Sequence, residues 1–424
     1  MENSHTSVNI SSSYFQGNNP FELTKAYGSP LYVYNERILR QRCREMTGLV
    51  SYPRYTAHYS AKANSSLALL QIIRSEGLCV DAMTPGEIMV GMKAGFTPDQ
   101  ILYVSNNVSE DEMRYAVERG ILMSVDSLSQ LAQLGRVNPG GRVAVRFNPG
   151  EGAGHHEKTI TAGRGTKFGV ENCAEDISQV KDICRRHGLR LVGLNMHVGS
   201  LFMDPSAYMN SSRSLAEIAM NFDDLDFIDL GGGFGNPYHK RDGQARMDLA
   251  ALGRELTEFM YGASAAYGKT LEFKIEPGRY ITAECGVLLG SVHAVKLAYG
   301  TKYVGTDIGF NVLARPVMYD SHHDIEVYAA DGAAPPREEA VTVVGNICET
   351  GDVLAKDRLL PEVREGDMVC VLDAGAYGHV MSSNYNNRLR PAEVLIRENS
   401  DAVLIRERDS LEDLVARCKP ILLN

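Results

Sequence analysis

The chain has 424 residues, of which 44% are hydrophobic and 23% charged, and these ordinary globular values exclude a largely disordered protein. Its 43 Lys and Arg residues face 53 Asp and Glu residues, and the resulting net charge of −10 argues against unspecific binding to nucleic acid or acidic membranes. We expect a cytoplasmic protein without a membrane partner, because no apolar run approaches the roughly 18 residues of a membrane span and no secretory signal begins the chain.

The first predicted strand is Leu31–Tyr34. From about Tyr55 onward, short apolar or β-branched runs alternate with amphipathic segments, which is the pattern of βα units. Eight strands are predicted here, at Tyr55–Tyr59, Leu78–Asp81, Ile101–Val104, Leu122–Val125, Val143–Phe147, Leu191–His197, Phe227–Leu230 and Leu271–Ile275. Helical spacing of apolar residues predicts helices at Ser65–Glu76, Pro85–Ala94, Glu110–Arg119, Ala174–His187, Pro205–Met220 and Leu249–Tyr267. Eight such units favour a (β/α)8 barrel over an open doubly wound sheet.

After Tyr280 the pattern changes to strands without long intervening helices. They are predicted at Val287–Leu297, Val341–Ile347, Met368–Leu372, Ala392–Ile396 and Ala402–Arg406. The fold prediction is therefore an α/β protein with a barrel in residues 36–280 and an all-β domain in residues 281–424. The strand within residues 1–35 is expected to join the C-terminal sheet.

Polar residues gather at the ends of the predicted barrel strands, where the active sites of such barrels lie. They are Lys62, Asp81, Asn106, Asp126, Arg146, Asn148, His197, Gly231–Gly233 and Glu276. Loops begin at strand ends, so chance accounts for some of them. A lysine, a histidine and a glutamate on one rim nevertheless indicate a common ligand.

Each of these features has an ordinary explanation when taken alone. Lys62 follows a buried strand, where partial desolvation favours its amine as a Schiff-base nucleophile, but it could equally be a surface lysine. The glycines of Gly231–Gly233 let backbone N–H groups approach a phosphate, yet three glycines usually make only a tight turn. Glu276–Arg279 reads as a strand-ending turn, and a lone histidine such as His197 is more often a core residue.

Together the same residues fit pyridoxal phosphate, with Lys62 for the aldehyde, the glycine loops for the phosphate, His197 for the pyridine ring and Glu276 for the ring nitrogen. A carboxylate facing that nitrogen keeps it protonated. The ring can then accept the electron pair released when a bond at the α-carbon of the substrate breaks. Such an electron sink favours loss of carbon dioxide.

From about Gly28 to Ile396 the sequence resembles the fold-type III pyridoxal-phosphate decarboxylases, and most closely the diaminopimelate decarboxylases. The motifs are specific in combination. They are Tyr59–Asn64, His197–Ser200, the segments at Gly231 and Glu276, Arg315–Tyr319, Cys348–Asp352, Asp373–Tyr377 and Asn384–Asn386. The resemblance implies a barrel followed by a β-domain of the alanine-racemase type. It also implies decarboxylation of meso-2,6-diaminopimelate at its D-centre, which gives L-lysine and carbon dioxide in lysine biosynthesis.

The resemblance also implies roles for individual residues. Lys62 and Cys348 would be catalytic, with Cys348 returning a proton to the α-carbon, a role that suits a thiol. A head-to-tail homodimer is implied in which each site takes Cys348 and Glu349 from the other chain. Cofactor contacts are expected from Lys62, Asp81, His197, Ser200, Gly232, Gly233, Glu276, Gly278, Arg279 and Tyr377. Substrate contacts are expected from Arg279, Arg315, Tyr319, Glu349 and Tyr377.

There are two departures from the family pattern: the first is minor, and the second leads into the substrate segment before Arg315 and leaves a modified or larger substrate open. Thr350 stands where a serine is usual, and Asp307–Val312 replaces a stretch that is usually richer in glycine and acidic residues. One alternative is therefore a decarboxylase of carboxynorspermidine, ornithine, arginine or a siderophore or antibiotic precursor. Another is a non-catalytic regulatory protein that binds pyridoxal phosphate. Arg315 with Tyr319 argues against simple diamine precursors, and Lys62 with Cys348 argues against a non-catalytic protein.

No metal site is predicted. The eight cysteines show no Cys-x-x-Cys spacing, so neither a zinc knuckle nor a disulfide framework is indicated. The pairs His155-His156 and His322-His323 are the remaining candidates. Neighbouring side chains point in different directions, and no carboxylate stands at ligand spacing around either pair.

Overall fold

The computed structural model describes residues 11–421 apart from 151, 153, 155, 164 and 333–336. It divides into two compact units. One runs from Leu39 to Ala283, and the other combines the chain up to Ile38 with the chain from Glu284 onward. Among the described helices, none is both long and apolar enough to cross a bilayer.

The first unit is built on a closed ring of eight parallel strands, which confirms the predicted (β/α)8 barrel. The ring runs β2-β3-β4-β5-β6-β8-β9-β10 and returns to β2, and the β5–β6 and β10–β2 pairings close it. Its strands are β2 (Tyr55–Ser60), β3 (Cys79–Ala82), β4 (Ile101–Val104), β5 (Leu122–Val125), β6 (Arg142–Asn148), β8 (Arg190–Asn195), β9 (Phe227–Asp229) and β10 (Glu272–Ile275). The two-residue strand β7 (Val170–Glu171) pairs with β6 outside the ring.

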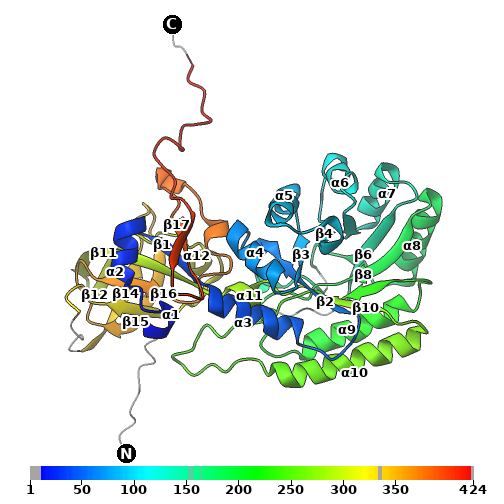
Figure 1. Ribbon diagram of the computed structural model, residues 1–424, viewed down its shortest axis with the longest axis horizontal. Coiled ribbons are helices and arrows are strands. Elements are labelled where there is room, and N and C mark those ends of the chain that lie inside the picture. Colours follow the sequence, from blue (N-terminus) through cyan, green and yellow to red (C-terminus); the bar gives the residue numbers. More distant parts are fainter. Residues whose placement is uncertain are drawn as a thin grey trace, which may run out of the picture. The chain divides into compact units, whose positions relative to one another are not determined.

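Helices follow the barrel strands and lie around them in Figure 1. They are α4 (Leu67–Ser75), α5 (Pro85–Ala94), α6 (Glu110–Val117), α7 (Leu128–Val137), α8 (Ala174–His187), α9 (Ser206–Ala219) and α10 (Leu249–Tyr267). The helix α7 was not predicted, although its apolar residues recur every three positions from Leu128. It begins after Ser127, whose side chain accepts a hydrogen bond from the Gln130 N–H as an N-cap. Helix α3 (Glu36–Thr47) and the one-turn helix α11 (Arg279–Thr282) flank the βα series.

Polar side chains are buried at the carboxyl ends of four ring strands. Ser60, Asn195 and Asp229 are the last residues of their strands, and Asp81 is the next-to-last residue of β3. All four side chains are almost completely buried. Buried polar groups need hydrogen-bond partners, so this layer of the barrel interior brings polar residues together at one end.

The second unit is built on a nine-stranded sheet with the order β15-β14-β12-β11-β1-β17-β18, to which β16 and β13 are attached through β11. The strands are β1 (Leu31–Asn35), β11 (Gly286–Ala298), β12 (Thr301–Thr306), β13 (Ile325–Tyr328), β14 (Glu338–Val344), β15 (Val353–Pro361), β16 (Met368–Val371), β17 (Ala392–Ile396) and β18 (Ala402–Arg406). Strand β1 pairs antiparallel with β11 and parallel with β17. Strands β12, β13 and β15 were not predicted, because they are short or interrupted by charged residues.

Short helices complete the second unit. They are α1 (Ser11–Tyr14), α2 (Pro20–Tyr27) and α12 (Arg315–Tyr319). Tyr14 and Phe15 are buried against the apolar face of the sheet. The Tyr14 hydroxyl donates to the carbonyl oxygens of Val33 and Cys285 at 2.8 and 2.6 Å. Tyr14 and Phe15 thus belong to the core of this unit.

Candidate active site

Lys62 lies at the carboxyl end of β2, in the short 3-10 turn Ala61–Ala63. Its Nζ atom is 2.6 Å from Asp81 Oδ2 and 3.1 Å from Ser60 Oγ. Asp81 is fully buried on the neighbouring strand, whereas the Lys62 side chain is 30% exposed. The lysine amine is therefore anchored on its inner side and still accessible at the end of the barrel.

A group of buried carboxyls lies on the same end of the barrel. Burial, followed by the charges of Asp229 and Asp81, raises the pKa of Glu276 well above its usual value. Burial also raises the pKa of Asp229 to about 6. The Gly231 N–H donates to Asp229 Oδ1 at 3.0 Å, and Oδ2 accepts no hydrogen bond from the described residues. Desolvation and the neighbouring carboxylates thus favour the protonated form of Glu276 in the cofactor-free protein. The Asn195 Nδ2 group donates to Glu276 Oε1 at 3.2 Å.

His197 follows β8 and is held by the glycine loop. The Gly232 N–H donates to its Nδ1 atom at 3.1 Å. Burial, and then the charges of Lys62 and Arg146, lower the pKa of His197 well below its ordinary value. The ring is therefore neutral, with Nδ1 as acceptor and the proton on Nε2.

The glycine loop after β9 needs residues without side chains. Gly231 and Gly233 have φ angles of 68° and 109°, in the region that favours glycine. A Cβ atom on Gly232 would collide with the carbonyl oxygen of Glu276. The loop is tied to the next strand, because the Glu276 N–H donates to the Gly231 carbonyl at 2.8 Å. This geometry packs a backbone loop tightly against the backbone of Glu276.

Arg279 begins α11 directly after Gly278, and its guanidinium is buried. Its Nε and Nη2 atoms donate to Ser200 Oγ at 3.2 and 3.0 Å. Nη1 donates to the Tyr238 hydroxyl at 3.1 Å. The predicted residues Ser200 and Arg279 thus contact each other directly.

The structure brings nine predicted residues together at the carboxyl end of the barrel. They are Lys62, Asp81, His197, Ser200, Gly232, Gly233, Glu276, Gly278 and Arg279. Asn195, Asp229 and Tyr238 contact this group but were not predicted as site residues. Asn195 and Asp229 lie at strand ends, so a full search for polar residues at the ends of the barrel strands would have found them. Tyr238 lies in a long loop and carries no local signal.

The remaining predicted residues lie in the second unit. Arg315 and Tyr319 begin and end α12, and Arg315 is 1% exposed. Cys348 and Glu349 lie in the turn between β14 and β15, where Cys348 is exposed. The Cys348 N–H donates to Asn386 Oδ1 at 3.1 Å, and the Tyr385 hydroxyl donates to Glu349.

Tyr377 follows β16 and has a positive φ of 55°. This conformation is uncommon for a residue with a side chain and is typically found where neighbouring structure enforces it. Tyr377 thus lies on a constrained loop of the second unit.

The histidine pairs make other contacts. His155 lies outside the described residues, and His156 Nδ1 accepts a hydrogen bond from the Lys158 N–H. His322 contacts Asp324 and Arg358. Within the described part of the chain, no group of three or more His, Cys, Asp or Glu residues could hold a metal ion.

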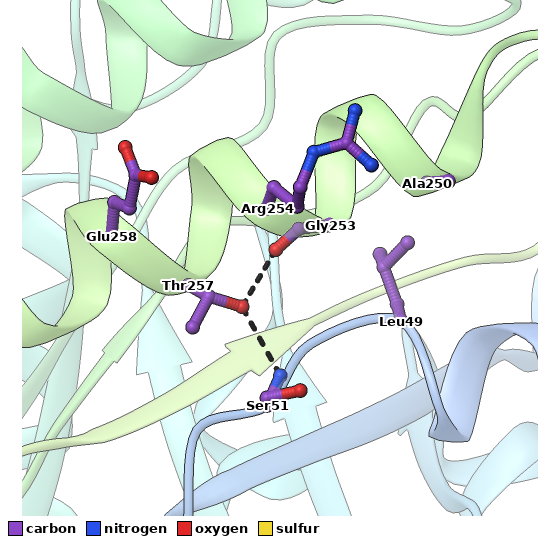
Figure 2. Close-up of a pocket in the computed structure, with 7 residues that line it drawn as sticks. All are labelled: Leu49, Ser51, Ala250, Gly253, Arg254, Thr257 and Glu258. Atoms are coloured by element: carbon purple, nitrogen blue, oxygen red, sulfur yellow. Dashed lines mark hydrogen bonds between the residues drawn. The ribbon is translucent and has the colours of Figure 1, made fainter.

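A groove of about 350 Å³ lies beside α10 and the segment that leads into β2 (Figure 2). Within it the Thr257 hydroxyl donates to the Gly253 carbonyl and accepts from the Ser51 N–H, at 2.6 and 3.1 Å. The hydroxyl group is thus already engaged. The groove is lined by Leu49 and Ser51, which come before β2 in the chain, whereas Lys62 lies at the carboxyl end of β2. The groove is therefore separate from the candidate active site.

Comparison with known proteins places this geometry in a family. The sequence model described as "Pyridoxal-dependent decarboxylase, pyridoxal binding domain" matches residues 36–283. The chain belongs to this family. Among its relatives, the diaminopimelate decarboxylase of Methanothermobacter thermautotrophicus is 40% identical over 408 residues, which cover 94% of each chain. The diaminopimelate decarboxylase of Escherichia coli K12 is 36% identical over 94% of this chain and 96% of its own.

Solved structures of these decarboxylases share the whole architecture. Diaminopimelate decarboxylase from Helicobacter pylori, complexed with L-lysine, has a TM-score of 0.86 at 29% identity and covers 94% of this chain and 98% of its own. The lysine/ornithine decarboxylase of Vibrio vulnificus has a TM-score of 0.76 at 22% identity and covers 90% of this chain and 98% of its own. This second likeness shows a shared fold.

The residues of the barrel site fit the cofactor of this family. Asp81 Oδ1 and Asn195 Oδ1 are buried acceptors that receive no hydrogen bond from any described residue. Buried acceptors of this kind are rare unless a ligand or water supplies the donor. The glycine loop packs against the backbone of Glu276, with no room for a side chain on Gly232. An accessible lysine amine, a buried carboxyl with a raised pKa and a glycine cradle together suit a phosphorylated pyridine aldehyde.

Proposed function

We propose that the protein removes the carboxylate at the D-centre of meso-2,6-diaminopimelate as carbon dioxide and releases L-lysine. The observation that carries this function is the anchored Lys62 amine beside the buried Glu276 group, in a chain similar to diaminopimelate decarboxylases along 94% of its length. The reaction is a carboxy-lyase step of lysine biosynthesis.

The barrel residues would hold pyridoxal phosphate. Lys62 would bind the aldehyde covalently, with Asp81 and Ser60 fixing its amine. Backbone N–H groups of Gly233 and Gly278, together with Ser200 and Arg279, would bind the phosphate, and Gly232 would let the backbone come close to it. His197 would contact the pyridine ring as a neutral imidazole, which adds no charge to a cationic ring.

The bound cofactor supplies an electron sink for the electron pair left at the α-carbon when carbon dioxide departs. The chain contributes the proton that this sink needs. Burial favours the protonated form of Glu276, and this carboxyl would present its proton to the ring nitrogen. Asn195 fixes the orientation of the Glu276 carboxyl by donating to Oε1.

Arginine, tyrosine and glutamate side chains would bind the substrate. Arg279, Arg315 and Tyr319 would bind the carboxylate that the product retains, because the guanidinium fork matches a carboxylate. Glu349 would bind the distal amino group, and Tyr377 would contact both substrate and phosphate.

We also propose a head-to-tail homodimer in which each active site receives Cys348 and Glu349 from the other chain. Cys348 would then return a proton to the α-carbon after decarboxylation. The exposure of Cys348 and Glu349 in the isolated chain supports this arrangement, since both side chains are available to a neighbour.

The direct test is to incubate the pure enzyme, supplied with pyridoxal phosphate, with meso-2,6-diaminopimelate or with ornithine. We expect L-lysine and an equal amount of carbon dioxide from the first substrate and little product from the second. Absence of lysine would reject the proposed substrate. Putrescine from ornithine would favour the alternative of a diamine-forming decarboxylase on the same scaffold. No product from any amino acid, with the cofactor bound, would favour a non-catalytic regulatory protein.

A cytoplasmic location is also proposed. All eight cysteines are free in the structure, including the exposed Cys348 and Cys418. Exposed free thiols persist in a reducing compartment, whereas oxidising compartments tend to pair them. Cell fractionation with an antibody against the protein would test this location.

A further inference from the structure

His323, the second residue of the His322-His323 pair, makes two short hydrogen bonds. Its Nδ1 atom is 2.7 Å from the carbonyl oxygen of Leu372, and its Nε2 atom is 2.8 Å from Arg315 Nη1. His323 and Arg315 are 2% and 1% exposed. The histidine therefore connects a backbone carbonyl to the buried guanidinium of Arg315.

These two contacts fix the protonation state of the ring. A carbonyl oxygen can only accept, so Nδ1 must carry a proton and donate it to Leu372. A guanidinium can only donate, so Nε2 must be unprotonated and accept from Arg315. Of the states of histidine, the neutral ring with its proton on Nδ1 alone satisfies both partners. The hydrogen bond to the Leu372 carbonyl therefore orients the ring, and the oriented ring presents Nε2 as the acceptor for Arg315.

The anchor of this pair is part of the sheet. Strands β13 and β16 are antiparallel, with Ile325 opposite Val371. The ladder continues one step further, because the Leu372 N–H donates to the Asp324 carbonyl at 2.9 Å. His323 is the next residue along and adds its own bond to Leu372. Its imidazole is thus fixed by the regular end of a sheet and not by a loose loop.

Arg315 itself lies on a much shorter element. It is the first residue of the five-residue helix α12, and the turn that follows contains Asp320 with a φ of 49°. A one-turn helix constrains a long side chain weakly, and a buried guanidinium needs acceptors at defined positions. His323 supplies one such acceptor from the sheet.

We propose that His323 is a positioning residue, which holds the Arg315 guanidinium in the orientation that binds the carboxylate retained in the product. This inference rests on the proposed function, because it takes the Arg315 ligand to be the carboxylate of L-lysine and of its parent substrate. His323 itself does not contact the reacting atoms.

The test measures equilibrium binding of L-lysine and of L-lysinamide to the holoenzyme by calorimetry. L-lysinamide lacks the carboxylate and serves as the internal reference. We expect His323→Leu to weaken L-lysine binding about tenfold, because Arg315 loses a charge-assisted hydrogen bond, and to leave L-lysinamide binding unchanged. KM for meso-2,6-diaminopimelate should rise by a similar factor, with a smaller effect on kcat.

Two amide variants separate positioning from folding. His323→Gln can place an acceptor near the former Nε2 position and should restore most of the L-lysine affinity. His323→Asn can retain the bond to the Leu372 carbonyl but is too short to reach Arg315, so it should bind L-lysine as weakly as His323→Leu. This comparison still decides the question if His323→Leu does not fold. His322→Gln is the matched control and should bind both ligands as the parent does.

The inference is overturned if His323→Leu and His323→Asn bind L-lysine within twofold of the parent. It is also overturned if they weaken L-lysine and L-lysinamide equally, because that result indicates a general structural role. Failure of the proposed function has a different signature. In that case the parent enzyme itself forms no L-lysine from meso-2,6-diaminopimelate, and both proposals fall together.

Discussion

At the scale of single residues, the acid pair Asp229 and Glu276 shows how burial prepares chemistry. Burial raises the pKa of both carboxyls, to about 6 for Asp229 and well above the ordinary value for Glu276. The charge of the buried Arg146 lowers the pKa of Glu276, but this effect is smaller than the increase caused by burial. The barrel interior therefore stores a proton where a pyridine nitrogen would need one.

This pair predicts a pH dependence of stability in cofactor-free protein. Folding raises the pKa of Asp229 from 3.8 to about 6, so the folded state binds the proton more tightly than the unfolded chain does. Its contribution to stability is complete below about pH 4, is lost as the pH rises toward about 6, and changes little above that. Between these two pH limits the free energy of unfolding should fall by about 3 kcal/mol. Asp229→Asn should remove much of this decline, measured by urea unfolding between pH 4 and pH 7.

The control for this measurement is Asp223→Asn, which changes an exposed aspartate in the loop before β9. It should leave the pH profile of the parent unchanged. Parallel profiles for the parent and Asp229→Asn would contradict the assignment of a raised pKa to Asp229.

At the scale of elements, the glycine loop after β9 is the part of the barrel with the least steric freedom. Gly232→Ala would place a Cβ atom against the Glu276 carbonyl oxygen, so the backbone of the loop must move. We expect the affinity for pyridoxal phosphate to fall at least tenfold, on the order of 1.4 kcal/mol or more. Titration of cofactor-free protein with pyridoxal phosphate, followed by absorbance, measures this loss.

Gly262→Ala is the matched control for the loop. Gly262 lies within α10, where an added Cβ would meet nothing within 4 Å. Alanine favours helix over glycine, so this variant should be slightly more stable and should bind the cofactor as the parent does. Equal cofactor affinity in both variants would show that the loop tolerates a side chain.

At the scale of the whole molecule, the proposed shared active sites predict complementation between two inactive variants. Lys62→Ala should lose the near-visible absorbance of the bound cofactor, whereas Cys348→Ala should keep it and turn over very slowly. If sites are shared, a mixed dimer contains one intact site, formed by Lys62 of one chain and Cys348 of the other. Random exchange of subunits should then recover about a quarter of the parent activity.

The complementation assay needs proof of subunit exchange. Two different affinity tags and sequential purification isolate the mixed dimer. If that isolated dimer has no activity, sites are not shared between chains. Full activity of Cys348→Ala by itself would move the proton donor to another residue.

The sequence by itself determined the barrel and most of the candidate site. Alternating apolar strands and amphipathic helices are local patterns, and the rule that barrel sites lie after the strands was enough to identify Lys62, His197 and Glu276. Local patterns could not reveal β12 and β15, whose charged residues hide their alternation. Pairing with distant strands makes these segments part of the sheet.

Only the tertiary structure decided how the site residues act on one another. The raised pKa values of Asp229 and Glu276 depend on the burial of both residues at neighbouring strand ends, and spacing along the chain carries no measure of burial. His323 was considered from sequence only as a possible metal ligand. Its partners, Arg315 and the Leu372 carbonyl, are eight and 49 residues away along the chain, so folding had to bring them together before its hydrogen bonds could form.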